Sequence, residues 1–387
     1  MKRITLLAAL LALVACNPNN TDPQNPSGQE TPETPETPTS TGVETPAFAL
    51  GADISWASEM ENGGRTFQKK SGAKAELTEV LKDCGVNAIR LRVWVNPYKS
   101  WSGKADVVAV AKKVKAAGLA LMIDFHYSDF FADPSRQLVP SAWEADKNDV
   151  DKLCTRVASH TKEVLQALKD AGVDVHWVQV GNETRNGMLW PAGQLWTNSG
   201  DVPNGRSNFA KLYNAGYDAA KAVYPSALVM PHLNNAYEDN DWWFSQIKAA
   251  GGKFDAIALS HYPQAESGMT AAQYNSKAVS RIKELYKTYR IPVIVSEIGV
   301  KQKSSDGAAV GAAVLEDFMT QIRSVSGCKG VFYWEPETDG TWKPEIYDNQ
   351  SELRKYSGDA TTDTWNAYDM GAFTTSGAPS AIMDAFR

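Results

Sequence analysis

Short apolar runs alternate with amphipathic segments through most of this chain. The runs are rich in Val, Ile, Leu and Ala, and eight of them lie at residues 48–54, 87–95, 119–125, 175–180, 227–230, 254–259, 292–295 and 330–333. Stretches with helical spacing lie between them, most clearly at residues 75–84, 107–117 and 150–171. Regular alternation of this kind predicts parallel βα units, and eight such units close a barrel. We therefore predict the α/β class and a (β/α)₈ TIM barrel.

An open, doubly wound sheet is the alternative that the same alternation allows. Such a sheet would carry a Gly-rich phosphate-binding turn after its first strand, and Gly63-Gly64 is too isolated to serve as one. The predicted strands instead end in polar or aromatic side chains, as TIM-barrel enzymes do at the face that carries their active sites. The barrel is therefore the better prediction.

The first 46 residues have a different composition from the rest. Residues 1–16, MKRITLLAALLALVAC, combine two basic residues with an apolar run too short to span a bilayer as a mature helix. The closing Leu-Val-Ala-Cys resembles a bacterial lipoprotein box, so a signal peptidase would cut before Cys16 and the cysteine would carry lipid. The alternative is an ordinary signal peptide with an incidental cysteine.

Residues 17–46 are dominated by Asn, Pro, Thr, Ser, Gly and Glu, with Glu-Thr-Pro repeated. Such a segment buries too little apolar surface to fold, and its prolines favour extended chain. We predict a flexible linker here and a single catalytic domain at residues 47–387.

The charge argues against nucleic acid as a partner, and the cysteine spacing argues against a zinc site. The net charge of −6 argues against nucleic acid, whose backbone attracts a basic face. Cys84, Cys154 and Cys328 show no spacing typical of zinc ligands, and three cysteines cannot all pair. We expect small buried side chains with at most one disulfide, and no cofactor.

Two glutamates form the candidate catalytic pair. Glu183 follows Val-Gln-Val-Gly-Asn and Glu297 follows Val-Ile-Val-Ser, so each carboxyl group comes at the end of an apolar predicted strand. Two carboxyl groups brought together at one rim can hydrolyse a glycosidic bond, one as general acid and one as nucleophile or base. Either alone could be a structural carboxylate, but both in this position favour catalysis.

Six segments in order resemble glycoside hydrolase family 53, the endo-β-1,4-galactanases, within the clan of retaining (β/α)₈ glycosidases. They are GADIS at 51–55, RLRVW at 90–94, DFHYSD at 124–129, QVGNE at 179–183, SEIG at 296–299 and FYWEP at 332–336. The resemblance implies endo-hydrolysis of β-1,4-galactan, the side chain of pectic arabinogalactan, with retention. It also implies a polysaccharide partner.

The resemblance also implies roles for individual residues. Glu183 would be the acid/base and Glu297 the nucleophile. The other members of the implied site would bind the sugar or support the nucleophile, and they are Asp53, Arg90, His126, Asp129, Asn182, His261, Tyr262 and Trp334. Of the alternating pair Arg90 and Arg92, we take Arg90 as the support of Glu297. Trp94, Trp101, Trp190, Trp196 and Trp342 are either platforms for distal sugar rings or packing residues.

One departure from the family concerns calcium. Some bacterial members bind Ca²⁺ in a long loop after the seventh strand, whereas residues 300–313 here are short and contain Asp306 as their only acid. We predict no metal at this loop. For the whole protein we predict a monomeric outer-membrane lipoprotein at the cell surface, with the periplasmic face as the alternative.

Two other functions fit parts of the sequence. Another clan member, a β-1,4-glucanase or mannanase, would share Glu183, Glu297 and Asn182, but the segments at 51–55 and 124–129 argue against it. A surface lipoprotein that binds glycan without cleaving it would explain the leader and the 12 Trp. It would not need the pair of glutamates.

Overall fold

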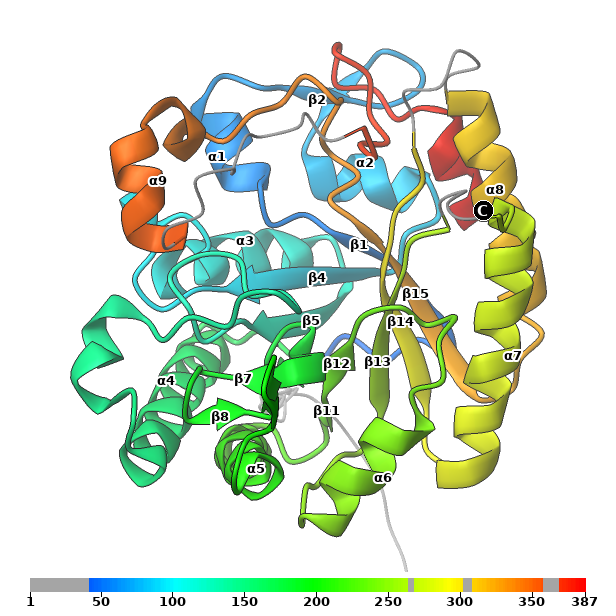
Figure 1. The fold of residues 1–387 in the computed structure, drawn as a ribbon. Helices are drawn as coiled ribbons and strands as arrows, with labels where there is room; N and C mark the ends of the chain where they lie inside the picture. Colours follow the sequence, from blue (N-terminus) through cyan, green and yellow to red (C-terminus); the bar gives the residue numbers. More distant parts are fainter. Residues whose placement is uncertain (1–41, 264–267, 302–307, 358–368) are drawn as a thin grey trace, which may run out of the picture. The chain divides into compact units, whose positions relative to one another are not determined.

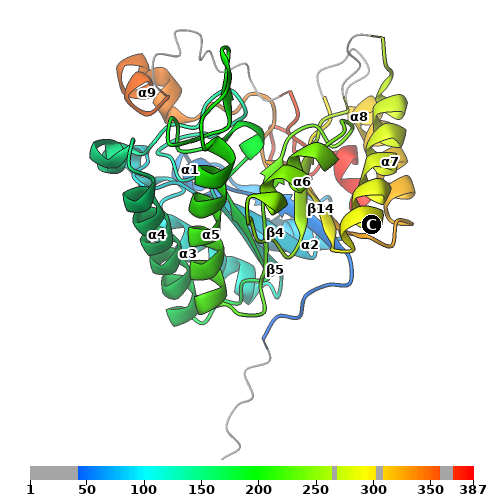
Figure 2. The same ribbon diagram turned by 60° about the horizontal axis from the view of Figure 1, so that its bottom comes forward.

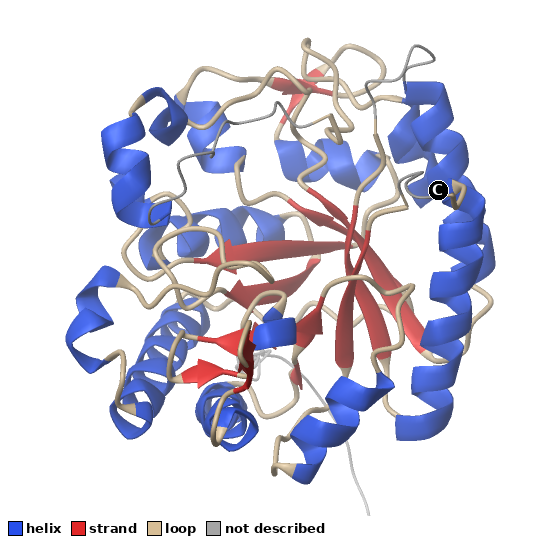
Figure 3. Cartoon of the chain, viewed as in Figure 1, coloured by secondary structure: helices blue, strands red, loops and turns tan. Residues whose placement is uncertain are grey.

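Nine parallel strands form one sheet in the part of the chain that the computed structural model describes, residues 42–263, 268–301, 308–357 and 369–387 (Figures 1 and 3). The signal peptide, most of the linker and Asp306 lie outside these residues. The strands are β1 (Ala49–Asp53), β4 (Ala88–Val93), β5 (Ala120–Phe125), β6 (Trp177–Val180), β11 (Leu228–Met230), β12 (His232–Leu233), β13 (Ile257–His261), β14 (Val293–Ile298) and β15 (Cys328–Trp334). Their order is β11-β6-β5-β4-β1-β15-β14-β13-β12.

The sheet closes because β11 and β12 are two halves of one barrel strand. β11 pairs with β6 and β12 pairs with β13, so the two edges of the sheet are joined through Pro231. Proline has no N–H to donate to a ladder, but its carbonyl accepts from Ala258 N at 3.0 Å. Counting the two halves as one strand gives eight, so the predicted (β/α)₈ barrel is confirmed.

Helices cover the outside of the barrel (Figure 2). They are α2 (Leu77–Asp83), α3 (Lys104–Ala116), α4 (Val150–Asp170), α5 (Gly205–Val223), α6 (Asp241–Ala249), α7 (Ala271–Tyr289) and α8 (Ala308–Ile322), with the 3₁₀ helix η5 (Ala381–Phe386) packed beside α8. In α4, Leu153, Val157, Val164 and Leu168 share the buried face, as the helical period requires. Among the described residues no helix is both long and apolar enough to cross a bilayer.

Six shorter helices lie in the loops of the described chain. They are α1 (Ala57–Asn62), α9 (Gln350–Ser357) and the 3₁₀ helices η1 (Tyr98–Ser100), η2 (Ser141–Asp146), η3 (Thr184–Asn186) and η4 (Glu345–Asp348). Of these, η3 immediately follows Glu183.

The barrel interior changes character along the strands. Towards the N-terminal ends it is apolar, with Met122, Trp177, Ile294 and Phe332 in contact. A Cβ on Gly51 would lie 2.0 Å from the Phe332 ring, so this position has room only for glycine. Because side chains alternate along a strand, the next inward residues on β4, β5 and β6 are polar, namely Arg90, Asp124 and Gln179.

The described chain begins at the N-terminal end of the barrel. Val43 N donates to Asp174 Oδ2 at 3.1 Å, and His176 Nε2 donates to Val43 O at 2.7 Å. Both partners directly precede β6, so the last residues of the predicted linker contact the end of the barrel at which the strands begin. All three described cysteines, Cys84, Cys154 and Cys328, are free.

Candidate active site

Arg90 is the cation at the centre of the C-terminal mouth of the barrel. Its guanidinium donates to Asp53 Oδ2 at 2.6 Å, Asp124 Oδ2 at 2.8 Å and Glu297 Oε1 at 2.8 Å. Nε donates to Gln179 Oε1 at 2.8 Å, and Nη2 also reaches Asn182 Oδ1 at 3.1 Å. Burial disfavours the charged guanidinium, but the three carboxyl groups outweigh it and raise the pKa of Arg90 above its usual value.

Asp124 and His126 extend this network on β5 and the residue after it. His126 Nδ1 accepts from Ala132 N at 3.0 Å, which leaves Nε2 as the donor to Asp124 Oδ2 at 3.0 Å. Burial opposes ionisation of Asp124, yet the charge of Arg90 and the contact with His126 lower its pKa to about 2. Asp124 is therefore a carboxylate that fixes the orientation of both neighbours.

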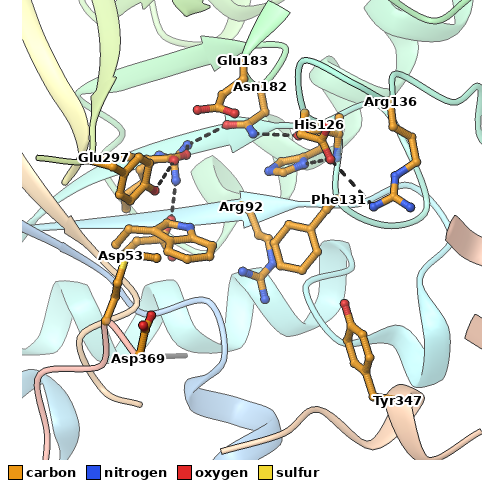
Figure 4. Close-up of a pocket in the computed structure, with 16 residues that line it drawn as sticks. Asp53, Arg92, His126, Phe131, Arg136, Asn182, Glu183, Glu297, Tyr347 and Asp369 are labelled. Carbon is orange, nitrogen blue, oxygen red and sulfur yellow. Dashed lines mark hydrogen bonds and ion pairs between the residues drawn. The ribbon is translucent and has the colours of Figure 1, made fainter. Parts of the chain in front are cut away.

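Glu183 and Glu297 face each other across the mouth, as Figure 4 shows. A carboxyl oxygen of one lies within 4.8 Å of a carboxyl oxygen of the other. Ser260 Oγ bridges them, at 2.6 Å from Glu183 Oε1 and 3.3 Å from Glu297 Oε2. Tyr262 donates to Glu297 Oε2 at 2.8 Å.

The two carboxyl groups have different environments. Burial and the nearby charge of Glu297 raise the pKa of Glu183 to about 8. Burial also raises the pKa of Glu297, but Arg90 and the Tyr262 hydroxyl oppose that rise. At neutral pH the proton of the pair therefore resides on Glu183, and Glu297 is the carboxylate.

The backbone at the end of β6 turns sharply to present Glu183. Gly181 has φ 85° and Glu183 has φ 45°, in the left-handed region that a non-glycine residue seldom occupies. Gln137 Nε2 donates to Asn182 O at 2.9 Å, and Glu183 N lies 3.3 Å from His232 Nδ1. A strained conformation held from both sides is typical of a functional position.

His232 lies beneath the pair as a neutral imidazole. Its Nε2 is 2.8 Å from Ser260 Oγ and its Nδ1 is 2.9 Å from Asn182 Oδ1. Burial, and then the charge of Arg90, lower its pKa well below the usual value. His232 thus links the residue that contacts both carboxyl groups to the amide beside the acid.

A cleft of about 580 Å³ opens over these groups. Its walls come from the C-terminal ends of the strands and from the loops after β5 and β15, and its lining residues include Arg92, Phe131, Arg136, Trp334, Tyr347 and Asp369. Aromatic faces together with hydroxyl and charged side chains suit the faces and edges of sugar rings. The cleft is an open groove in which a polymer chain can lie.

Most of the predicted site residues meet at this cleft. Asp53, Arg90, His126, Asn182, Glu183, Tyr262, Glu297 and Trp334 all line it. The placement of His261 and Asp129 differs from the prediction.

His261 does not face the cleft. Successive side chains of β13 point to opposite faces of the sheet, so Ser260 and Tyr262 point inward and His261 points out towards the helices. There its Nε2 bonds Asn275 Oδ1 at 2.9 Å and its ring packs on Phe318. The expectation that His261 lines the site is wrong.

Asp129 connects neighbouring loops through hydrogen bonds and does not face the catalytic cleft. Its Oδ1 accepts from Asn96 N at 2.9 Å, and its Oδ2 accepts from the backbone N and the hydroxyl of Ser141 at 2.8 and 2.6 Å. Both oxygens are therefore occupied within the protein, and the expected contact with sugar in this cleft is not supported.

The sequence analysis did not place Ser260, Arg92, Phe131 and Tyr347 in the site. Ser260 could have been found, because it precedes Tyr262 by two residues on one strand and so shares its face. Phe131 and Tyr347 lie in loops, where no periodicity indicates the direction of a side chain. Of the five candidate platforms, Trp94 is an internal packing residue, stacked on Phe130 with ring centroids 5.3 Å apart.

Within the described ranges, one group of residues has a geometry that could hold a metal ion. It consists of Glu183, His232 and Glu297. Both ring nitrogens of His232 already contact Asn182 and Ser260, so the proximity of the three is accounted for by hydrogen bonding. The prediction that the loop at 300–313 binds no calcium depends on Asp306, which lies outside the described residues.

Comparison with known proteins gives three concordant similarities. The model of glycosyl hydrolase family 53 matches residues 49–386. A probable arabinogalactan endo-β-1,4-galactanase A of Neosartorya fischeri is 33% identical over 312 residues, covering 74% of this chain and 83% of that protein. The endo-β-1,4-galactanase of Bacillus subtilis is 30% identical over 355 residues, covering 84% of this chain and 75% of that protein.

A solved structure is also similar in fold. It belongs to a study of two fungal β-1,4-galactanases and superposes with a TM-score of 0.71 at 26% identity, covering 87% of this chain and 98% of that one.

Proposed function

This chain belongs to glycosyl hydrolase family 53, and from that premise we propose that it hydrolyses internal β-1,4-galactosidic linkages of pectic galactan with retention of configuration. The observation that carries the mechanism is the spacing of Glu183 and Glu297, whose nearest oxygens lie within 4.8 Å. Retaining glycosidases hold their two carboxyl groups about 5–5.5 Å apart, whereas inverting enzymes need about 6.5–9.5 Å to admit a water.

In the first step Glu297 attacks the anomeric carbon. Its ionised form is favoured by Arg90 at 2.8 Å, and Tyr262 orients Oε2. Glu183 holds the proton at neutral pH and gives it to the departing glycosidic oxygen, so that the leaving sugar departs as an alcohol. The product is a galactosyl ester of Glu297.

In the second step water replaces the leaving group. With the ester formed, Glu297 carries no charge, and the electrostatic contribution that raised the pKa of Glu183 is lost. Glu183, now ionised, accepts a proton from the attacking water, which breaks the ester and regenerates both carboxyl groups. The same separation of the two groups therefore supplies an acid and then a base.

Asn182 is placed to recognise the sugar at the point of cleavage. Its Oδ1 is held by Arg90, and its Nδ2 donates to Ala132 O at 2.8 Å, so the amide orientation is fixed. The second N–H of Nδ2 remains available for the sugar 2-hydroxyl, a contact that strengthens in the oxocarbenium-like transition state. Trp334 lines the same cleft and packs edge-to-face against Tyr262, with ring centroids 6.2 Å apart.

The test is release of reducing ends by the full chain from linear β-1,4-galactan, with β-1,4-glucan and β-1,4-mannan as the competing substrates. We expect cleavage of galactan, and loss of about 10⁴-fold in kcat for Glu297→Gln. Preferential cleavage of glucan or mannan would refute galactan as the substrate and would leave the proposed mechanism unchanged. Binding of galactan without hydrolysis of any of the three polysaccharides would refute the proposed enzymatic activity.

We also propose that Cys16 carries lipid and anchors a monomer at the outer membrane, on the cell surface where the polymer is found. Support comes from the leader MKRITLLAALLALVAC and the Pro/Thr-rich segment after it. Incorporation of labelled fatty acid that is lost in Cys16→Ser tests the anchor, protease treatment of intact cells tests the membrane face, and gel filtration tests the monomer.

A further inference from the structure

Two tryptophans form an exposed pair outside the catalytic cleft. In the described parts of the chain three large apolar side chains are exposed, namely Leu138, Trp242 and Val310. Trp242 is 36% exposed and lies against the half-buried Trp196, with ring centroids 6.0 Å apart and planes at 52°. Indole surface left in solvent forgoes a large hydrophobic gain, and in a protein that acts on glycans it is a candidate sugar platform.

The turn after the catalytic acid holds Trp196. Asn186 closes η3, three residues after Glu183, and its side chain pairs with the backbone of Trp196 in both directions. Asn186 Nδ2 donates to Trp196 O at 3.1 Å, and Trp196 N donates to Asn186 Oδ1 at 2.9 Å. Trp196 therefore has a fixed position relative to Glu183.

The same turn holds the first turn of α6, which carries Trp242. Arg185 Nη2 donates to Asn240 Oδ1 at 2.6 Å, at the start of the helix. Trp243, next to Trp242, donates from its Nε1 to Arg185 O at 2.9 Å. Both members of the pair are thus attached to η3. In Figure 1, β7 (Gly187–Met188) and β8 (Gly193–Gln194) of this loop, and α6, lie beside α5.

Polar groups surround the pair. Trp196 lies in β9 (Trp196–Thr197), where it pairs across the hairpin with Asp201 of β10 (Gly200–Asp201). Arg206 of α5 donates to Asp201 Oδ2 at 2.8 Å and also bonds Gln246 of α6. An aromatic surface edged by charged and amide side chains can stack on a sugar ring and bond its hydroxyls.

We propose that Trp196 and Trp242 bind a galactosyl unit of the substrate on the leaving-group side of the scissile bond. The general acid lies on the leaving-group side, and the pair is attached to the turn that carries the acid. The axial O4 of galactose leaves the C–H bonds at C3, C4 and C5 on one face, which stacks on indole. This proposal rests on the proposed function and adds a binding site beyond the cleft.

The test compares Trp242→Ala with Trp242→Phe and with Val310→Ala, which removes exposed apolar surface on α8. Each full-length variant is assayed on long β-1,4-galactan and on the shortest galacto-oligosaccharide that the wild type cleaves. We expect Trp242→Ala to lower kcat/KM on the polymer about tenfold and to leave the short substrate unchanged. Trp242→Phe should lose less kcat/KM on the polymer than Trp242→Ala, because Phe keeps an aromatic face. Val310→Ala should match the wild type. Thermal unfolding checks that each variant is folded.

The outcomes separate this proposal from the one on which it rests. If the wild type cleaves galactan and Trp242→Ala equals Val310→Ala on both substrates, the platform is refuted and the activity stands. Equal loss on both substrates would also refute it, because the effect would then be structural. If the wild type cleaves no galactan, both proposals fall together.

Discussion

Arg90 and Arg92 lie two residues apart on one strand, both buried, yet their surroundings differ. Arg90 bonds three carboxyl groups, Asp53, Asp124 and Glu297, within 2.8 Å. Among the described residues Arg92 forms an ion pair with one carboxyl group, that of Glu335, and its guanidinium lies over the rings of Trp56, Trp94 and Phe131 at 4.0, 4.5 and 4.9 Å from their centroids.

The difference lies in the balance of charge. Beside Arg92, burial and the neighbouring Glu335 raise the pKa of Glu337 well above its usual value, so Glu337 stays protonated. Around Arg90 the carboxyl groups outnumber the cation, and across the mouth burial and the charge of Glu297 raise the pKa of Glu183 to about 8, so Glu183 retains its proton. The Arg90 cluster therefore contains the nucleophile whose charge helps to keep the acid protonated, whereas Arg92 belongs to the wall of the cleft.

Replacing Arg90 should give the largest effect. Arg90→Met leaves three buried carboxyl groups without their cation, and the pKa of Glu297 rises because its main stabilising charge is gone. We expect kcat/KM on galactan to fall about a thousandfold or more and the free energy of unfolding to fall by about 3–5 kcal/mol. Urea unfolding and initial rates measure the two.

Replacing Arg92 is the matched comparison. Arg92→Met removes the cation beside Glu335, which still accepts from Trp56 Nε1 at 2.7 Å, and keeps apolar volume among the three aromatic rings. We expect a loss of about 3 kcal/mol in unfolding free energy, with kcat within about tenfold of the wild type. A loss of kcat as large as that of Arg90→Met would show that the two clusters are not functionally distinct.

Acid should weaken the Arg90 cluster through Asp124. Its pKa is about 2 in the folded protein and ordinarily 3.8, so its contribution is present above pH 4 and is lost as the pH falls through 2. The loss amounts to about 2 kcal/mol. Urea unfolding at pH 5 and pH 2.5 should show a smaller pH dependence in Asp124→Asn than in the wild type. Glu316→Gln, which removes an exposed carboxyl group on α8, should leave the dependence unchanged.

The smallest effect concerns the proton on Glu183. Activity should fall above about pH 8 as Glu183 ionises. The Ser260 hydroxyl stabilises the ionised form, so Ser260→Ala should raise the pKa of Glu183 and move the alkaline limb of kcat/KM up by about one pH unit. Ser296→Ala is the control, because Ser296 Oγ is buried beside Glu297 without a hydrogen-bond partner among the described residues. A downward shift in Ser260→Ala would contradict this role.

The sequence predicted the barrel because its strands are buried on both faces, which makes each one a short apolar run. It did not predict the break at Pro231, since the pairing of β11 and β12 with different neighbours is a property of the closed sheet. It also predicted the site residues at the strand ends, because each of them lies at or directly after one of these apolar runs.

The site residues that were misplaced or missed lie where the two-residue period of a strand was not applied, or in loops that have no such period. His261 was misplaced because being at a strand end does not specify which face a side chain takes, although the two-residue period from Tyr262 does. Asp129 lies beyond a strand, where loop hydrogen bonds decide its direction. Phe131 and Tyr347 reach the cleft only through the packing of distant loops, which a single sequence does not encode as a pattern.

The anchoring of Val43 places the first described residues at the end of the barrel opposite the active site. Val43 is held by Asp174 and His176 just before β6, and Glu183 follows just after β6, so the length of one strand separates the chain's entry from the acid. Anything that tethers the chain through residue 42 is therefore attached to the back of the enzyme. If Cys16 carries the proposed lipid, the tether joins the barrel at the end opposite the cleft, so its point of attachment leaves the mouth uncovered for the polymer.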